Sequence, residues 1–256
     1  MSQSSVADRR VDVALGDDGI AHVRLLRTDK INALDNAMFA GLIDAGEVLG
    51  KLRDLRCVVL SGEGRGFCAG LDLSMFAALT GAMPPLATRT HGSANSFQQV
   101  AMQWRALPVP VIAAVHGVCF GGGLQIAGGA DIRVVAPDTR LAVMELKWGI
   151  IPDMGGFAMW RGIVRDDVLR ELTWSAREFS GEEALRLGFA TFLDADPLAR
   201  ALAIAREIAA KDPSAIRAAK ALFNRVPELS SDEILLAESI AQDGLLAARR
   251  GQGADS

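Results

Sequence analysis

The chain has 256 residues, 50% hydrophobic and 23% charged, which is the composition of a globular protein with a large apolar core. Its net charge of −4 and the lack of a long basic run argue against nucleic acid or an anionic membrane as its main partner. The longest apolar run, residues 109–115, is too short to span a bilayer. Three cysteines without CxxC spacing and a polar N-terminus without a signal sequence lead us to expect a soluble, cytoplasmic protein with free thiols.

Short apolar runs alternate with helical patterns over the first half of the chain. Apolar runs at residues 20–26, 57–60, 109–115 and 132–135 predict strands that are covered on both faces. Helices are predicted at 38–52, at 95–107 and from residue 123. This alternation predicts an α/β fold.

The C-terminal part has a different texture. Residues 198–210, 214–223 and 231–249 read as Ala/Leu-rich helices with no strand between them, punctuated by Pro197, Pro213 and Pro227. We therefore divide the chain into a core at residues 1–195 and a helical region at 196–256. The least regular stretch, residues 80–96, is interpreted as a mobile loop.

Two predicted strands run into segments of small residues. The strand at 57–60 leads into SGEGRGFCAGLDL (61–73), and the strand at 109–115 leads into HGVCFGGGLQ (116–125). Main-chain N–H groups can face outward from such turns, and two that converge on one point form an oxyanion hole. The alternative is that these glycines only allow tight turns or close packing.

A dinucleotide-binding loop is a weaker interpretation of the same glycines. Residues 64–69 fit the pattern G-x-G-x-x-A after a strand. However, no acid occurs between Asp72 and Asp131, so the residue that would hold the ribose about 20 positions later is missing. The triple glycine fails as well, because Ile126 stands where the last glycine belongs. A dinucleotide oxidoreductase is therefore the least favoured alternative.

Four segments carry a family resemblance: TDKINALD (28–35), GFCAGLDL (66–73), HGVCFGGGLQIAGGAD (116–131) and MELKWGIIPDMGG (144–156). In this order they resemble the crotonase family, the enoyl-CoA hydratase/isomerase superfamily. The resemblance implies a spiral of ββα units and a C-terminal helical region that assembles trimers or dimers of trimers. It also implies an acyl-CoA thioester as the binding partner. CoA would enter only as part of this substrate, without a metal or a redox cofactor.

The resemblance also assigns binding residues. The thioester oxygen would lie between the backbone N–H groups of Ala69 and Gly122, where a side chain at Gly122 would crowd it. The stretch of Ala69, Gly70, Leu71 and Asp72 would lie along CoA, with Lys30 near its phosphates.

Proton transfer next to a thioester needs a carboxylate, preferably in an apolar pocket that raises its pKa. Family hydratases use two glutamates, which map onto Gln125 and Glu145. An amide orients water but does not exchange a proton at neutral pH. Asp153, eight residues after Glu145, is the candidate for the second acid, as in the dienoyl-CoA isomerases of this family. The match is partial, because that branch carries an aspartate at the position of Gln125.

We therefore rank double-bond isomerisation first, with Glu145 as base and Asp153 as second acid. Hydration with Gln125 and Glu145 positioning water, thioester hydrolysis, decarboxylation and acyl-CoA binding without turnover remain open. Asp153 could instead cap a turn or helix, and Glu145 could be an ion-paired surface residue. Three further interpretations concern other side chains. The three histidines lack metal-ligand spacing, the Cys68 thiol is interpreted as a packing group, and Trp104, Trp148 and Trp160 as core residues.

Overall fold

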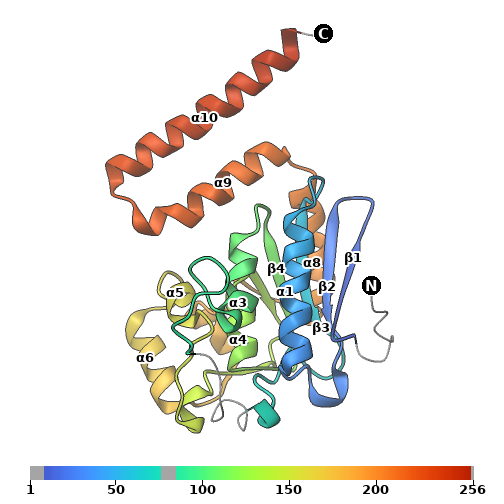
Figure 1. Cartoon of the computed structure of the whole chain (residues 1–256), viewed down its shortest axis with the longest axis vertical. Helices are drawn as coiled ribbons and strands as arrows, with labels where there is room; N and C mark the ends of the chain where they lie inside the picture. Colours follow the sequence, from blue (N-terminus) through green and yellow to red (C-terminus); the bar gives the residue numbers. More distant parts are fainter. Residues whose placement is uncertain (1–8, 76–84, 255–256) are drawn as a thin grey trace.

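A six-stranded sheet forms the centre of the computed structural model, which describes residues 9–75 and 85–254. The strands run in the order β1-β2-β3-β4-β6-β9 (Figure 1). The first pair is antiparallel and all other neighbours are parallel. The bounds are β1 Val11–Leu15, β2 Ile20–Leu25, β3 Cys57–Gly62, β4 Val111–Val115, β6 Ile132–Val135 and β9 Phe192–Leu193.

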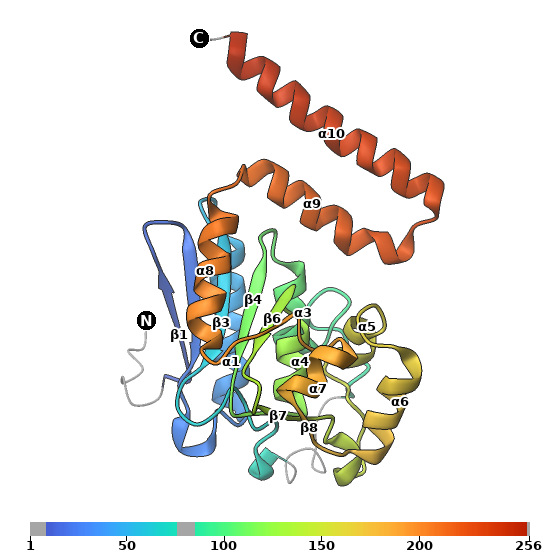
Figure 2. The same ribbon diagram turned by 180° about the vertical axis from the view of Figure 1, so that it is seen from behind.

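Helices cover both faces of this sheet, and β3 shows how its side chains divide between them. Val58 and Leu60 belong to the larger apolar cluster, whereas Cys57 and Val59 face the opposite side. The first cluster is covered by α1 (Asn36–Gly50), α3 (Ser96–Ala106) and α4 (Gly122–Gly128), and the second by α8 (Pro197–Ala209), as Figure 2 shows. Strands buried on both faces explain why they appear in the sequence as continuous apolar runs.

A second, three-stranded sheet has the order β5-β7-β8 and the bounds β5 Val118–Phe120, β7 Arg140–Ala142 and β8 Phe179–Ser180. The chain alternates between the two sheets, because β4 and β6 lie in the large sheet while β5 and β7 lie in the small one. The remaining elements up to β9 are η2 Thr28–Lys30, η3 Glu145–Trp148, α5 Gly156–Trp160, α6 Asp166–Ser175 and α7 Gly181–Leu187. Repeated β-β-α passages of this kind form the predicted spiral.

The helices after residue 195 differ in whether they pack on the large sheet. Helix α8 lies on the large sheet, with Ala201, Ile204 and Ala205 in its core. By contrast, α9 (Pro213–Arg225), η4 (Val226–Glu228) and α10 (Ser231–Ala254) extend away from the body (Figures 1 and 2). The boundary predicted at residue 195 therefore separates α8 from the sheet that it covers, and the projecting part begins with α9.

Side chains of α9 fasten it to the body: Arg217 and Asn224 donate to backbone carbonyls there, and Lys220 adds a buried ammonium group. Lys220 Nζ donates to the carbonyl oxygens of Trp104 and Val109, at 3.1 and 2.7 Å, and pairs with Asp131 Oδ2 at 2.7 Å. The same Asp131 oxygen accepts the N–H of Val111 at the start of β4. This network links α9 to the N-terminal ends of β4 and β6, opposite the strand ends from which the two predicted loops continue.

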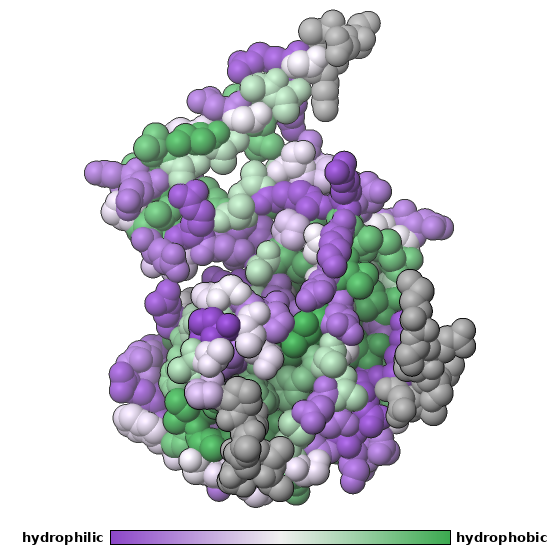
Figure 3. All heavy atoms as spheres, viewed as in Figure 1, coloured by the Kyte–Doolittle hydropathy of each residue, from purple (hydrophilic) through white to green (hydrophobic). Residues whose placement is uncertain are grey.

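Helix α10 leaves large apolar side chains uncovered. Leu235, Leu236 and Ile240 are each more than 60% exposed, and green apolar residues are visible along this helix in Figure 3. Within the described ranges, no helix is both long and apolar enough to traverse a bilayer.

The stretch predicted as a mobile loop has a more specific structure where it is described. Residues 80–84 lie outside the described residues. Residues 85–96 form hydrogen-bonded turns, which end in Asn95 as the N-cap of α3. The described part is therefore irregular, as predicted, with its turns held by hydrogen bonds, and its mobility stays a prediction.

Candidate active site

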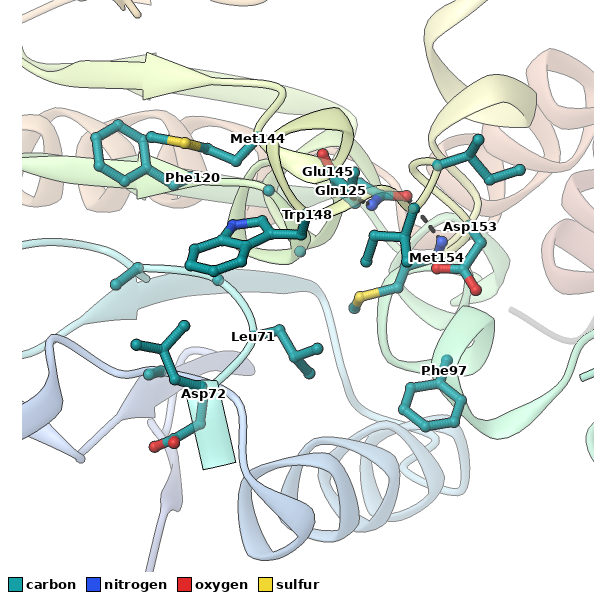
Figure 4. A pocket seen from close by; sticks show the side chains of 18 of the residues that line it. Leu71, Asp72, Phe97, Phe120, Gln125, Met144, Glu145, Trp148, Asp153 and Met154 are labelled. Atoms are coloured by element: carbon teal, nitrogen blue, oxygen red, sulfur yellow. Dashed lines mark hydrogen bonds between the residues drawn. The ribbon is translucent and has the colours of Figure 1, made fainter. Parts of the chain in front are cut away.

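A cavity of about 770 Å³ lies where the chain leaves the ends of β3 and β4. Its walls come mainly from residues 69–73, 120–125 and 144–154 (Figure 4). All nine candidate residues line it: Lys30, Ala69, Gly70, Leu71, Asp72, Gly122, Gln125, Glu145 and Asp153. The four sequence segments therefore meet at one site.

The two loops of small residues run side by side. Cys68 N donates to Val118 O and Phe120 N donates to Cys68 O, each at 3.0 Å. A Cβ built on Gly70 would come within 2.8 Å of Phe120 O and 3.6 Å of Gly122 N. Gly70 also has φ +90°, a conformation that favours glycine. At this point glycine is needed for the backbone approach between the loops.

The donor from the first loop differs from the predicted one. The N–H of Ala69 is occupied, because it donates to Ile31 O at 2.8 Å. On either side of Leu71, Leu34 N donates to Gly70 O and Asp72 N donates to Leu34 O. Since backbone groups of successive residues in an extended segment face opposite sides, the N–H of Leu71 points away from Leu34. It has no acceptor among the described residues, so Leu71 replaces Ala69 as the candidate donor.

In the second loop, the predicted donor is available for a ligand. Gly122 is the first residue of α4, and its N–H finds no acceptor within the described part of the chain. A Cβ at Gly122 would lie 2.8 Å from both Leu34 Cδ1 and Met154 Sδ. A larger residue would therefore displace the ends of these two flexible side chains, in addition to crowding a bound thioester.

Gln125 joins the two candidate acids. Its Nε2 donates to Glu145 Oε1 at 2.6 Å, and its Oε1 accepts the N–H groups of Met154 and Gly156 at 2.9 and 3.0 Å. The amide is thus bonded at one end to the glutamate and at the other to the turn that contains Asp153. This arrangement orients the Glu145 carboxyl.

Glu145 is buried, with 6% of its surface exposed, and it is not an ion-paired surface residue. Its Oε2 has no hydrogen-bond partner among the described residues. Burial raises the pKa of Glu145 above its ordinary value, while the hydrogen bond from Gln125 lowers it and the charge of Asp153 raises it further. Glu145 lines the cavity, and an unpartnered carboxylate oxygen is suited to accept a proton from a bound molecule that reaches it.

Asp153 is half-buried, and burial raises its pKa as well. It does not cap the following helix, because the N-cap of α5 is Gly155 and no side-chain capping bond is present there. Figure 4 shows its carboxyl beside Met154, on the far side of Gln125 from Glu145. The cavity therefore contains two carboxyls with separate surroundings.

Two predicted binding residues lie at the edge of the cavity. The Asp72 carboxylate pairs with Arg27, and hydrogen bonds from Ser74, followed by Arg27, lower the pKa of Asp72 to about 2. Its side chain points away from the cavity in Figure 4, so only its backbone could follow a ligand. Lys30, on η2, is exposed and lines the cavity.

The same fold is found in known acyl-CoA proteins. A sequence model described as enoyl-CoA hydratase/isomerase matches residues 16–247. The chain belongs to this family, the crotonase superfamily. The mitochondrial Delta(3,5)-Delta(2,4)-dienoyl-CoA isomerase of Mus musculus is 30% identical to this chain. The alignment covers 88% of this chain and 72% of the isomerase.

A mitochondrial methylglutaconyl-CoA hydratase from Mus musculus is 31% identical to this crotonase, over 90% of this chain and 76% of its own. A Thermobifida fusca enoyl-CoA hydratase homologue, whose crystal structure is in complex with acetoacetyl-CoA, superposes with a TM-score of 0.83. It is 27% identical and covers 95% of this chain and 97% of its own. Relatives of similar identity thus have different reactions in their names.

Three tryptophans were predicted to be core residues, and one of them is not. Trp104 and Trp160 are fully buried, whereas Trp148 is 54% exposed and lines the cavity of this crotonase (Figure 4). The short helix η3 turns Glu145 inward and Trp148 toward the mouth, a placement that no periodic pattern in the sequence indicated. The Cys68 thiol does behave as a packing group: it is buried, donates to Asn32 O at 3.0 Å, and burial raises its pKa to about 12.

Proposed function

We propose that this crotonase shifts double bonds in an enoyl- or dienoyl-CoA thioester. The observation that carries the proposal is the pair of separate carboxyls in one cavity, with Gln125 bound between Glu145 and the turn of Asp153. A double-bond shift removes a proton from one carbon and returns one to another, so it needs a base and an acid at two points along the chain.

The thioester oxygen would accept hydrogen bonds from the N–H groups of Leu71 and Gly122. Glu145 Oε2 would then take a proton from the acyl chain, and the electron pair of that C–H bond would move toward the thioester as an enolate. Asp153 would deliver a proton to a carbon farther along the chain as the electrons return. The burial that raises the pKa of Asp153 supports its protonated form, which this step requires.

The residues that line the cavity indicate where the CoA part of the ligand would lie. CoA would lie along residues 69–72 with its phosphates near Lys30, and it would arrive as part of the substrate. We infer no metal or redox cofactor for this reaction. The exposed apolar side chains of α10 support an assembly of copies through the C-terminal helices, in agreement with the expected trimer or dimer of trimers.

Hydration of a trans-2-enoyl-CoA is the second candidate. The observation in its favour is the second hydrogen on Gln125 Nε2, because only one is accounted for by the bond to Glu145. That hydrogen could orient a water molecule that Glu145 activates. The hydratase name of one relative is consistent with this candidate.

Absorbance measurements with defined thioesters test these candidates. Isomerisation predicts that a 3,5-dienoyl-CoA gains the absorbance of a conjugated thioester, whereas hydration predicts that a trans-2-enoyl-CoA loses it. If both spectra stay unchanged while the thioesters bind, the chain is an acyl-CoA binder and the proposed reaction is wrong.

A further inference from the structure

The loop that carries the Leu71 donor runs beside residues 27–35. Leu34 and Leu71 form an isolated parallel bridge between the two segments. Leu34 N donates to Gly70 O at 2.8 Å, and Asp72 N donates to Leu34 O at 3.0 Å. These two bonds enclose Leu71 and turn its own N–H away from Leu34. The direction of this donor therefore depends on how firmly the bridge is held.

One side chain is bonded to both segments of this bridge. Arg27 Nη1 donates to Ala33 O at 3.0 Å and to Asp72 Oδ2 at 2.5 Å. Ala33 directly precedes Leu34, and Asp72 directly follows Leu71, so the guanidinium connects the two segments at the bridge itself. The side chains of Arg27 and Asp72 are only 12% and 13% exposed, so water screens this pair less than an ion pair on the surface.

The turn that follows Arg27 has a strained backbone. Ile31 and Asn32 have φ of 49° and 54°, in the left-handed region, which is unfavourable for a β-branched residue such as Ile31. In this conformation Ile31 O takes up the N–H of Ala69. Arg27 closes the turn twice, because its carbonyl oxygen accepts the N–H of Asn32 at 2.8 Å and its guanidinium is bonded to the carbonyl that follows. A strained turn persists only where its surroundings hold it, and Arg27 supplies two of the bonds.

A second arginine offers a matched comparison. Arg27 Nε lies 3.3 Å from Asp35 Oδ2, and Arg10 Nη2 lies 3.2 Å from the same oxygen. Asp35 caps the N-terminus of α1. Arg10 shares this carboxylate with Arg27 but makes no side-chain hydrogen bond to Ala33 or Asp72, both of which lie in the described part of the chain. The two arginines therefore differ in their contact with the bridge.

We propose that Arg27 is a positioning residue of the oxyanion hole, which holds Leu34 and Leu71 together and so fixes the direction of the Leu71 N–H. Arg27 lies outside the set of described residues that line the cavity, and it acts through the bridge. The inference rests on the proposed function, because it takes the thioester oxygen to accept this N–H. Since the donor acts on charge that grows in the transition state, its displacement should lower kcat more than it raises KM.

The carbonyl stretch of a bound thioester measures the two donors without any turnover. Hydrogen bonds to the thioester oxygen lower the frequency of this stretch, and infrared difference spectra of butyryl-CoA with carbon-13 at the thioester carbon isolate it. We expect the unmodified protein to lower the frequency relative to the free ligand. Arg27→Met should lose roughly half of this decrease, because one of two donors is displaced. The Kd of butyryl-CoA should change by less than about threefold.

Further variants assign the effect to the bridge. Arg10→Met is the matched control, because it removes the other partner of Asp35, and it should leave the frequency unchanged. Arg27→Lys keeps the charge, but a single ammonium does not reproduce the directed bonds of the guanidinium, so the loss should be intermediate. Asp72→Asn added to Arg27→Met should change the frequency little further, because both substitutions break the same link. If Arg27→Met does not fold, Arg27→Lys and Asp72→Asn provide the same comparison.

Kinetics complete the test. In Arg27→Met, kcat should fall roughly tenfold to hundredfold, with KM within about threefold. A folded Arg27→Met protein that keeps the full decrease in frequency would overturn the proposal, and so would an equal loss in Arg10→Met.

The same spectra separate this inference from the proposed reaction. A decrease that depends on Arg27, without turnover of any enoyl- or dienoyl-CoA, would support the positioning role and reject the reaction. Turnover with a decrease that does not depend on Arg27 would do the reverse. If the unmodified protein does not lower the frequency at all, the hydrogen-bonded thioester is wrong and this inference falls with it.

Discussion

Gln125 Nε2 lies 2.6 Å from Glu145 Oε1, and the same amide accepts two N–H groups from the turn that contains Asp153. A neutral amide at this point gives Glu145 a hydrogen-bond donor rather than a second negative charge. This favours the ionised form of Glu145 against the burial that raises its pKa. The relationship explains why an amide occupies a position where family hydratases carry an acid.

Glu145→Gln should abolish turnover. The neutral side chain can still accept the bond from Gln125, so the cavity should keep its shape, but it removes no proton at neutral pH. We expect kcat to fall by at least roughly 10²–10⁴-fold, while the Kd for a saturated acyl-CoA changes little. Single-turnover kinetics and calorimetry measure the two quantities, and retained turnover would remove Glu145 from the role of base.

Gln125→Glu should move the pH profile. The new carboxyl would lie at the present 2.6 Å contact with Glu145, and two carboxyls at that separation share a proton, so the upper of the pair's two pKa values rises. The base must be ionised to act, so kcat/KM falls below this pKa. The acid limb of the profile should therefore shift upward by at least about one pH unit.

The unmodified protein sets the reference for that shift. Because burial raises the pKa of Glu145, its own acid limb should already lie above the ordinary value of 4.5. Gln242→Glu, on the exposed surface of α10, adds the same charge away from the cavity and should leave the limb unchanged. A limb in Gln125→Glu that stays where it was would mean that the amide does not control Glu145.

Asp153→Asn should separate the two candidate reactions. If Asp153 returns the proton, isomerisation of a dienoyl-CoA should fall by roughly 10²–10⁴-fold. An unchanged isomerisation rate would show that Asp153 lines the cavity without transferring a proton.

Lys220→Met should loosen the C-terminal helices from the body. The change leaves Asp131 without its cation and two buried carbonyl oxygens without a donor, which we expect to cost roughly 3 kcal/mol. The corresponding fall in Tm is roughly 6–12 °C for a domain of this size. Thermal unfolding measures it, and Lys211→Met, at an exposed position, is the control. Equal Tm values would show that the network does not hold α9.

The large sheet was predictable because its strands are apolar on both faces. The runs at residues 20–26 and 57–60 correspond to β2 and β3 with ends shifted by one or two residues, and the run at 132–135 matches β6. The small sheet could not be found in this way. Its strands are two or three residues long, too short to show a period. They form because the segment that follows β4 lies beside the segment that follows β6.

The site was predictable as a set of segments and less so as a set of atoms. All nine candidate residues that the motifs named line the cavity. The motifs pointed, however, to the N–H of Ala69 in the first loop, which is already bonded. The choice between Ala69 and Leu71 depends on hydrogen bonds with Ile31 and Leu34, which come from a different part of the chain. Such pairing has no local signature in the sequence.

The central claim is that two backbone donors and Glu145 converge on one thioester. A crystal structure with a saturated acyl-CoA measures this directly. We predict the thioester oxygen at roughly 2.7–3.1 Å from both Leu71 N and Gly122 N, with Glu145 Oε2 facing the carbons next to it. A thioester oxygen that contacts neither N–H, or a Glu145 carboxyl turned away from the acyl chain, would contradict the account.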